Sequence, residues 1–229
     1  MQLIDKLTEE HRLIELGAGS LIAFHREFEQ GKAALADLAG YAVFFRDYAD
    51  AYHHGKEEQI LMVQFPALGI DSESPPLRML REEHRGNKIL IEKFFQFAAQ
   101  TTPLSDMDKE ILRQSIFTYV IGLWEHIDKE DSVLFAEANL RFKGMLAQTL
   151  DKNFLEFEAR MGQPGNLDIP ALESNMRGLF LRFPPVEELP GVLRGEGCVS
   201  CRHYGGPCQG VEKEWWSEHE WEDFFERNR

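Results

Sequence analysis

Apolar residues recur at intervals of three and four along four long segments of the chain, the spacing expected of one buried helix face. These segments cover about residues 3–28, 34–63, 76–99 and 105–137. Short connections join the first segment to the second and the third to the fourth, so those neighbouring helices are expected to run in opposite directions. The pattern therefore predicts an all-α protein with an antiparallel, up-down-up-down four-helix bundle over residues 1–140.

The rest of the chain, residues 141–229, is predicted to form an appendage that packs on the bundle. A fifth helix is expected over about residues 139–161, followed by an irregular stretch containing Pro and Gly to about residue 197. The last part contains the three cysteines and three of the four tryptophans. We find no internal repeat and no low-complexity segment along the chain.

Each predicted bundle helix carries polar residues at positions that its own apolar pattern marks as buried. The interruptions occur once in the first helix and twice in each of the others, at His11, His53, Glu57, His84, Asn87, His126 and Glu130. A buried ionisable side chain is costly unless it is paired or bound to a metal ion. The histidines and glutamates of this set are therefore candidate metal ligands.

The four histidines are expected to meet at one level of the bundle. In this topology the first and third helices start where the second and fourth end, and the rise per residue puts all four roughly 10–17 Å from that end. A spacing of four residues places Glu57 on the same helix face as His53, and Glu130 on that of His126. One such histidine alone is more often an ordinary core residue, but six candidates in register favour a shared site.

Four imidazoles and two carboxylates can serve two metal ions. With both carboxylates bridging, each ion receives two histidines and two carboxylate oxygens. An oxo or hydroxo bridge adds a fifth ligand and leaves a position open for a small molecule. Imidazole and carboxylate ligands without thiolate suit iron or manganese better than a closed structural zinc site.

The sequence around these residues resembles the hemerythrin (HHE cation-binding) family. The matching stretches are TEEHRLI at His11, HHGKEEQIL at His53, REEHRGN at His84 and HIDKEDSVLF at His126. The resemblance covers about residues 1–140 and extends to bacterial non-haem di-iron proteins, including those associated with iron–sulfur cluster repair. It implies two iron ions with the four histidines as terminal ligands and with Glu57 and Glu130 as bridges.

Two departures from oxygen-carrying hemerythrins bear on function. Lys88 stands where those proteins usually have a second histidine in the third helix, and Glu130 follows His126 by four residues where they have an aspartate at five. One histidine fewer implies a more open site. His54 is expected to face a neighbouring helix or solvent, with a role as an additional ligand as the alternative. His25 is about 21 Å along the helix from His11 and is expected to be outside the cluster.

The C-terminal segment carries a second candidate site. The sequence CVSCRHYGGPC brings Cys198, Cys201, His203 and Cys208 together, which could form a zinc site, a metal-delivery clasp or part of an iron–sulfur site. The alternative is a set of plain reduced thiols. Residues 211–226 are rich in acids and aromatics, and are expected either to dock on the bundle or to bind a protein partner.

Composition narrows the function classes. A net charge of −14 argues against nucleic acid and anionic membranes as partners, because phosphate binding needs clustered Lys and Arg. The chain lacks an apolar run of 18 residues, and its acidic start is unlike a signal peptide, so a cytoplasmic location is expected. No nucleophile triad, phosphate loop or dinucleotide fingerprint is visible.

These observations favour a non-haem di-iron protein that binds or reacts with oxygen, nitric oxide or peroxide, as a sensor or stress-response protein. Two alternatives remain open. The first is iron handling or iron–sulfur cluster repair assisted by the C-terminal cysteines. The second is a metal-dependent regulatory protein that acts through its acidic, aromatic C-terminus.

Overall fold

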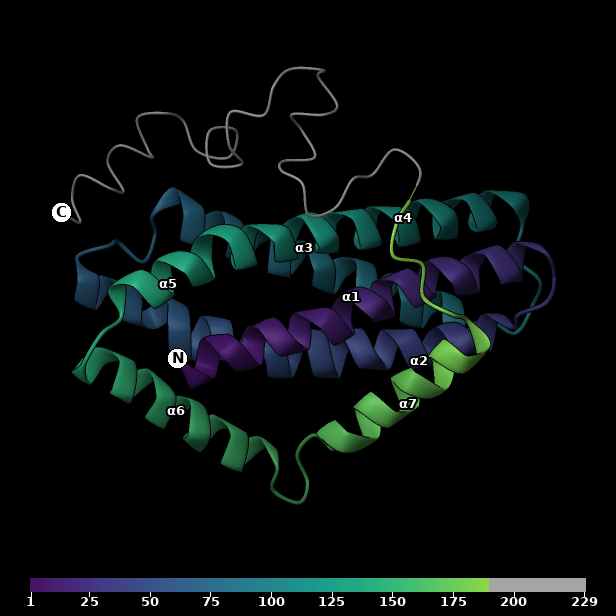
Figure 1. Ribbon diagram of the computed structural model, residues 1–229. Helices are drawn as coiled ribbons and strands as arrows, with labels where there is room; N and C mark the ends of the chain where they lie inside the picture. Colours follow the sequence, from purple (N-terminus) through teal and green to yellow (C-terminus); the bar gives the residue numbers. More distant parts are fainter. Residues whose placement is uncertain (190–229) are drawn as a thin grey trace.

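The structure is a computed structural model that describes residues 1–189. Four helical rods form a bundle, and two further helices lie along one side of it (Figure 1). The first and third rods are single helices, α1 (Gln2–Glu29) and α3 (Pro75–Ala98). The second rod begins after a short turn, η1 (Leu35–Asp37), and comprises α2 (Leu38–Val43), η2 (Phe44–His54), η3 (Glu57–Leu61) and η4 (Met62–Leu68). The fourth rod comprises α4 (Asp106–Lys129), η5 (Glu130–Leu134) and α5 (Phe135–Arg141).

The rods alternate in direction, as the sequence predicts. α1 packs against α4, α2 packs against α3, and α3 packs against α4 (Figure 1). Gly31, with φ of 71°, lies in the turn after α1, and Gly69, with φ of 81°, ends the second rod. Ser105 caps α4, because its hydroxyl accepts a hydrogen bond from the backbone N–H of Asp108. The prediction of an all-α bundle is confirmed.

The second and fourth rods widen where they carry the candidate ligands. The segments η2, η3 and η5 are π-helical, with hydrogen bonds to the fifth residue along instead of the fourth. Such turns contain more residues than an α-helical turn, so successive side chains are separated by a smaller rotation about the axis. Neighbouring residues in these segments can therefore face the bundle interior together.

Up to residue 189, two helices follow the bundle, one more than the sequence predicts. α6 spans Met145–Met161 and is separated from α5 by a break at Gly144, which has φ of 57°. The predicted single helix over 139–161 is thus divided in two. α7 spans Ile169–Arg182, within the stretch predicted to be irregular, and begins at Asp168, whose side chain accepts a hydrogen bond from Ala171 N–H. α6 lies against α1 and η3, and α7 against α2 and η2 (Figure 1).

The segment that follows α7 contacts the bundle at α1. The Ser20 hydroxyl donates a hydrogen bond to the Phe183 carbonyl (2.7 Å) and lies 2.7 Å from the Tyr41 hydroxyl. At Gly19 a Cβ atom would lie only 2.0 Å from the Val186 carbonyl oxygen, so only glycine permits this approach. The segment after α7 therefore needs a glycine on α1.

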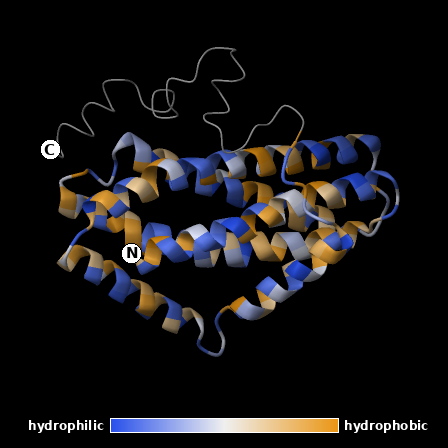
Figure 2. Ribbon diagram, viewed as in Figure 1, coloured by the Kyte–Doolittle hydropathy of each residue, from blue (hydrophilic) through white to orange (hydrophobic). Residues whose placement is uncertain are grey.

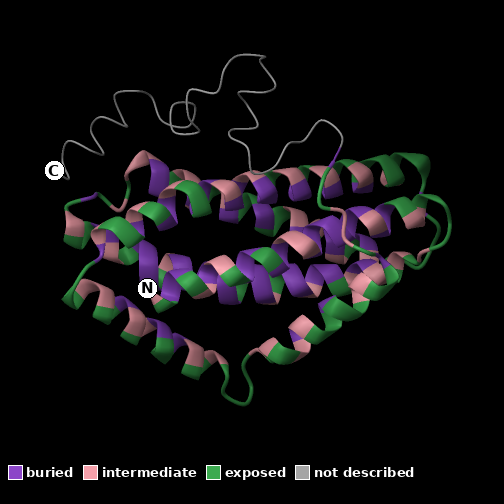
Figure 3. Ribbon diagram, viewed as in Figure 1, coloured by how far each residue is buried: buried purple, intermediate pink, exposed green. Residues whose placement is uncertain are grey.

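Apolar and buried residues gather on the inward faces of the four rods. Figure 2 shows that hydrophobic and hydrophilic residues alternate along each rod. Figure 3 shows that the buried residues face the bundle interior, while α6 and α7 are largely exposed or intermediate. Among the described helices, none is long and apolar enough to cross a membrane. Cys198, Cys201, His203, Cys208 and the acidic, aromatic segment lie outside the described residues, so their predicted roles stay predictions.

Candidate metal centre

The structure brings the six predicted ligand residues together inside the bundle. They come from all four rods, each is at most 1% exposed, and they are His11 on α1, His53 and Glu57 on the second rod, His84 on α3, and His126 and Glu130 on the fourth rod. With His54 they form two overlapping groups whose candidate ligand atoms lie within 4.8 Å of one another. The first group is His11, His53, Glu57 and Glu130, and the second is His54, Glu57, His84 and His126.

The two carboxylates lie between the groups. Glu57 Oε1 is 3.3 Å from His53 Nε2 and 3.8 Å from His11 Nε2, whereas its Oε2 is 3.7 Å from His84 Nε2. Glu130 Oε2 is 3.3 Å from His11 Nε2 and 3.2 Å from His126 Nε2. Each carboxylate thus contacts both groups, which is the arrangement that a bridging ligand requires.

Among residues 1–189, most of the inward-facing atoms of this cluster have no hydrogen-bond partner; the exceptions are Nε2 of His84 and Nε2 of His126, which lie within hydrogen-bond distance of each other. The buried side-chain atoms left unsatisfied include His11 Nε2, His53 Nε2 and both carboxylate oxygens of Glu57 and Glu130. Buried polar atoms are nearly always satisfied in native proteins, so a concentration of unsatisfied ones calls for a cause. A pair of cations between these atoms would satisfy them, and this chemistry fits the residues present.

Two histidine nitrogens approach each other closely at the second group. His84 Nε2 lies 3.0 Å from His126 Nε2. Two nitrogen ligands at right angles about one ion, each about 2.1 Å from it, are about 3.0 Å apart. The spacing of these two imidazoles therefore suits a single metal ion.

The protonation of the metal-free cluster also favours positive charge at its centre. Burial opposes protonation of His11, but the hydrogen bond to Asp131 and the carboxylate of Glu130 raise its pKa to about 10. The pKa of His84 is likewise raised to about 10, against burial, by Glu130 and Glu58. Burial would raise the pKa of Glu130, yet His126 and His11 hold it well below its usual value. Protons thus supply the charge that metal ions would otherwise bring.

His54 points into the cluster and not to solvent. Its side chain is buried, and its ring stacks on that of His84 with centroids 3.8 Å apart. The sequence-based expectation assumed the rotation of an α-helix between His53 and His54, which the π-helical turn of η2 reduces. Lys88, at the position of the missing third-helix histidine, lies 3.2 Å from Asp50, which is 3.5 Å from His54 Nδ1. Within residues 1–189 the cluster therefore contains five histidines, namely the four predicted ligands and His54, for which a ligand role was the alternative prediction.

An outer layer of carboxylates orients the histidines. Each ring donates its Nδ1 hydrogen to an acid on another rod: His11 to Asp131 (2.8 Å), His53 to Glu10 (2.9 Å), His84 to Glu58 (2.7 Å) and His126 to Glu83 (2.8 Å). A carboxylate at Nδ1 fixes the tautomer and turns Nε2 towards the metal position. Asp131, five residues after His126, thus serves this outer layer while Glu130 occupies the centre.

The outer layer reveals an internal repeat, contrary to the sequence-based expectation. Glu10 and His53 are 43 residues apart, as are Glu83 and His126. Each of these acids also forms an ion pair with a lysine three residues after its histidine, Lys56 or Lys129. The signal is present in the sequence as EEHR at 9–12 and 82–85, and as HxxKE with a following acid in each half. The pattern of apolar residues does not reveal this repeat, because all of the repeated residues are polar.

His25 lies apart from this cluster. It is buried, its ring packs edge-on against Phe117, and its Nδ1 is 3.7 Å from Glu29. Burial and the neighbouring cations Arg113 and Arg26 lower its pKa. His25 is therefore a core histidine, as the spacing from His11 predicts.

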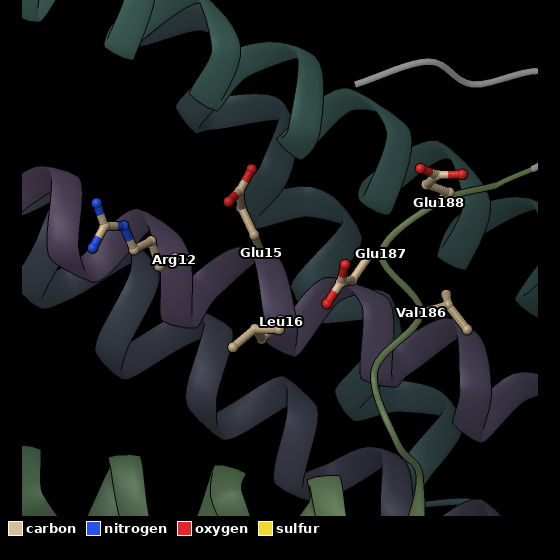
Figure 4. Close-up of a pocket in the computed structure, with 6 residues that line it drawn as sticks. All are labelled: Arg12, Glu15, Leu16, Val186, Glu187 and Glu188. Atoms are coloured by element: carbon tan, nitrogen blue, oxygen red, sulfur yellow. The ribbon is translucent and has the colours of Figure 1, made fainter. Parts of the chain in front are cut away.

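A surface pocket of about 380 Å³ lies beside α1 and the segment after α7 (Figure 4). Its lining is largely charged and comprises Arg12, Glu15, Leu16, Val186, Glu187 and Glu188. None of the candidate ligands lines it. The pocket is therefore a feature separate from the buried cluster.

Comparison with known proteins identifies one family. The family model described as the hemerythrin HHE cation binding domain matches residues 2–138, more than half of the chain. The match ends within α5, so α6 and α7 lie outside it. Neither the curated proteins nor the solved structures give a match.

Proposed function

The chain belongs to the hemerythrin HHE cation-binding domain family, and from this premise we propose that its buried cluster holds two iron ions and binds or reacts with oxygen, nitric oxide or peroxide. The observation that carries the proposal is the set of unsatisfied nitrogen and oxygen atoms aimed at the centre of the bundle. The family and the paired His/Glu groups establish a metal-binding protein. The choice of iron as the metal, and of oxygen, nitric oxide or peroxide as the ligand, goes beyond that result.

Iron is favoured by the donor set. As far as residues 1–189 are concerned, the two groups offer imidazole nitrogens and carboxylate oxygens without thiolate. Zinc in structural sites is usually held in a closed tetrahedral site that often includes cysteine, whereas nitrogen and oxygen ligands with an open position suit redox-active iron. Bound iron would supply one-electron chemistry and a place for a small ligand.

The two groups differ in ligand number, which assigns the small ligand to one of them. Counting the described residues, the second group has three histidines and the first has two, His11 and His53. The residue that corresponds to His54 in the other half is Ile127, which also follows its histidine directly and is buried. An apolar side chain at this position leaves a coordination position free near the first group.

Besides the carboxylates of the outer layer, the first group has apolar neighbours. The ring of Phe135 stacks on His11 with centroids 5.2 Å apart. Ile14 and Ile127 are buried nearby along the rods that carry His11 and His126. An uncharged diatomic molecule or peroxide enters such surroundings at less cost than an ion.

The test is spectroscopic and uses the full chain. Protein loaded anaerobically with ferrous iron is exposed in turn to nitric oxide, oxygen and hydrogen peroxide, and its optical spectrum is recorded. We expect a new visible band with at least one of these, and the loss of that band in His11→Ala. An iron-loaded protein whose optical spectrum does not change with any of the three reagents would overturn the proposed ligand class. Failure to retain iron would overturn the metal assignment.

A further inference from the structure

A chain of charged and polar side chains connects α6 to a candidate metal ligand. The Tyr52 hydroxyl donates to Glu158 on α6, 2.7 Å from each carboxylate oxygen. The Lys56 ammonium donates to Glu158 Oε1 (3.0 Å) and also to Glu10, which accepts a hydrogen bond from His53 Nδ1 (2.9 Å). Three side chains, Glu158, Lys56 and Glu10, therefore link the surface of α6 to the ring of His53.

Lys56 is the centre of this chain and is fully buried. Its exposed fraction is 0%, and its ammonium lies 3.5 Å from the centre of the Tyr52 ring. A buried charge is costly when it has no partner, and Lys56 keeps Glu10 as a partner even when Glu158 is absent. Glu10 is buried as well, whereas Glu158 is 29% exposed and is the point at which the chain reaches the surface.

The packing of α6 brings Glu158 to this position. At Gly55, beside Lys56, a Cβ atom would lie 3.1 Å from the ring of Phe157, so a glycine allows α6 to come close to the second rod. Further contacts along α6 are a hydrogen bond from Leu3 N–H to Asp151 and one from Arg160 to Gln59. The helix is thus seated along its length on the rods that carry His11 and His53.

We propose that Glu158 is a positioning residue of the metal centre, which acts through Lys56 and Glu10 on His53, so that α6 completes the outer layer of the first group. The inference rests on the proposed metal site and adds a residue from outside the segment that the family model matches. With Glu158 in place, the Lys56 ammonium is shared between two carboxylates. Without it, Lys56 turns fully to Glu10 and weakens the hold of Glu10 on the His53 ring.

The structure offers a matched control on α7. Glu173 accepts a hydrogen bond from the Tyr48 hydroxyl (3.3 Å), as Glu158 does from Tyr52. Tyr48 and Tyr52 lie one turn apart on η2. Glu173→Gln therefore removes a similar tyrosine–acid contact from the same rod, but leaves the connection between Lys56 and His53 intact.

The experiment measures how fast a chelator removes iron from the fully loaded chain. For Glu158→Gln we expect the iron ion of the first group, which includes His53, to be extracted roughly tenfold faster than in the wild type. This factor is the lower end of the range for outer-layer residues. The rate for Glu173→Gln should equal that of the wild type. The melting temperatures of the metal-free variants should be alike, which separates positioning from a general loss of stability.

A second pair of variants tests the route. In a Lys56→Met background, the further change Glu158→Gln should have no additional effect on extraction, because the connection is already broken. Equal rates for Glu158→Gln and the wild type would overturn the inference, as would an equal acceleration in Glu173→Gln. A wild-type chain that holds no iron would instead overturn the proposed function, so the two failures are distinguishable.

Discussion

Replacement of His54 by leucine is expected to weaken metal binding while sparing the metal-free fold. His54 is buried, and burial together with the nearby His84 and His126 lowers its pKa well below 6.5, so it is neutral at pH 7. Its Nδ1 is without a hydrogen-bond partner. Leucine has a similar bulk and removes an unsatisfied polar atom, so the metal-free protein should lose little stability.

The cost appears when metal binds. Loss of an outer-layer contact alone reduces metal affinity about 10–100-fold, and the loss of a direct ligand should cost at least as much. That range corresponds to about 1.4–2.7 kcal/mol of binding free energy. In a domain of this size each kcal/mol shifts the melting temperature by about 2–4 °C. The metal-induced rise in melting temperature should therefore be about 3–11 °C smaller in His54→Leu than in the wild type.

The assay is thermal unfolding followed by circular dichroism, with and without a fixed excess of ferrous iron under anaerobic conditions. His25→Leu is the matched control, because His25 is a buried histidine outside the cluster. It should shift both melting temperatures equally and leave the metal-induced rise unchanged. A metal-induced rise in His54→Leu equal to that of the wild type would refute the role of His54 as a ligand. So would a drop confined to the metal-free protein.

Three further predictions follow from the same centre. Ile127→His should fill the open position near the first group, so the chain should still bind two irons but lose its spectral response to nitric oxide; an unchanged response would contradict the assignment of the open side. Glu10→Gln and Glu83→Gln occupy equivalent places in the repeat, and each should weaken iron binding about 10–100-fold in chelator competition; an effect in only one of them would show that the halves are not equivalent. The raised pKa values of His11 and His84, about 10, give the metal-free fold a contribution that is fully present below pH 6.5 and is lost as the pH rises through 10. Urea denaturation of metal-free protein should therefore show lower stability at pH 10 than at pH 6.5, and a rise over that range would contradict the pairing with the carboxylates.

The bundle and the six predicted ligand residues could be read from the sequence, because both depend on helical periodicity. The apolar stripes locate the rods, and a buried His or Glu in such a stripe stands out as an interruption. The i,i+4 spacing of His53 with Glu57 keeps its meaning as long as the helix is nearly regular. The meeting of these residues at one level then follows from the alternating direction of the rods.

His54 could not be placed in this way. A rotation of about 100° per residue separates it from His53 in an α-helix, and the π-helical segment η2 reduces this rotation. A rule based on regular helices therefore predicts contact with a neighbouring helix or solvent, and His54 does stack on His84 of the neighbouring helix α3.

The outer layer and α7 were missed for different reasons. Glu10 and Glu83 directly precede histidines and look like ordinary surface acids, because their role depends on a partner on another rod. α7 follows a short loop that contains Pro164 and Gly165, which suggests an irregular segment. Its start at Asp168, with Pro170 in the first turn, is a helix signal that outweighs them.

The most direct test of the account is a crystal structure of the iron-loaded chain with anomalous diffraction at the iron edge. We expect two anomalous peaks about 3.5–4 Å apart, both between Glu57 and Glu130, with His54 at the ion that also contacts His84 and His126. A single peak, or peaks away from these two carboxylates, would contradict the central claim that the bundle holds a pair of iron ions.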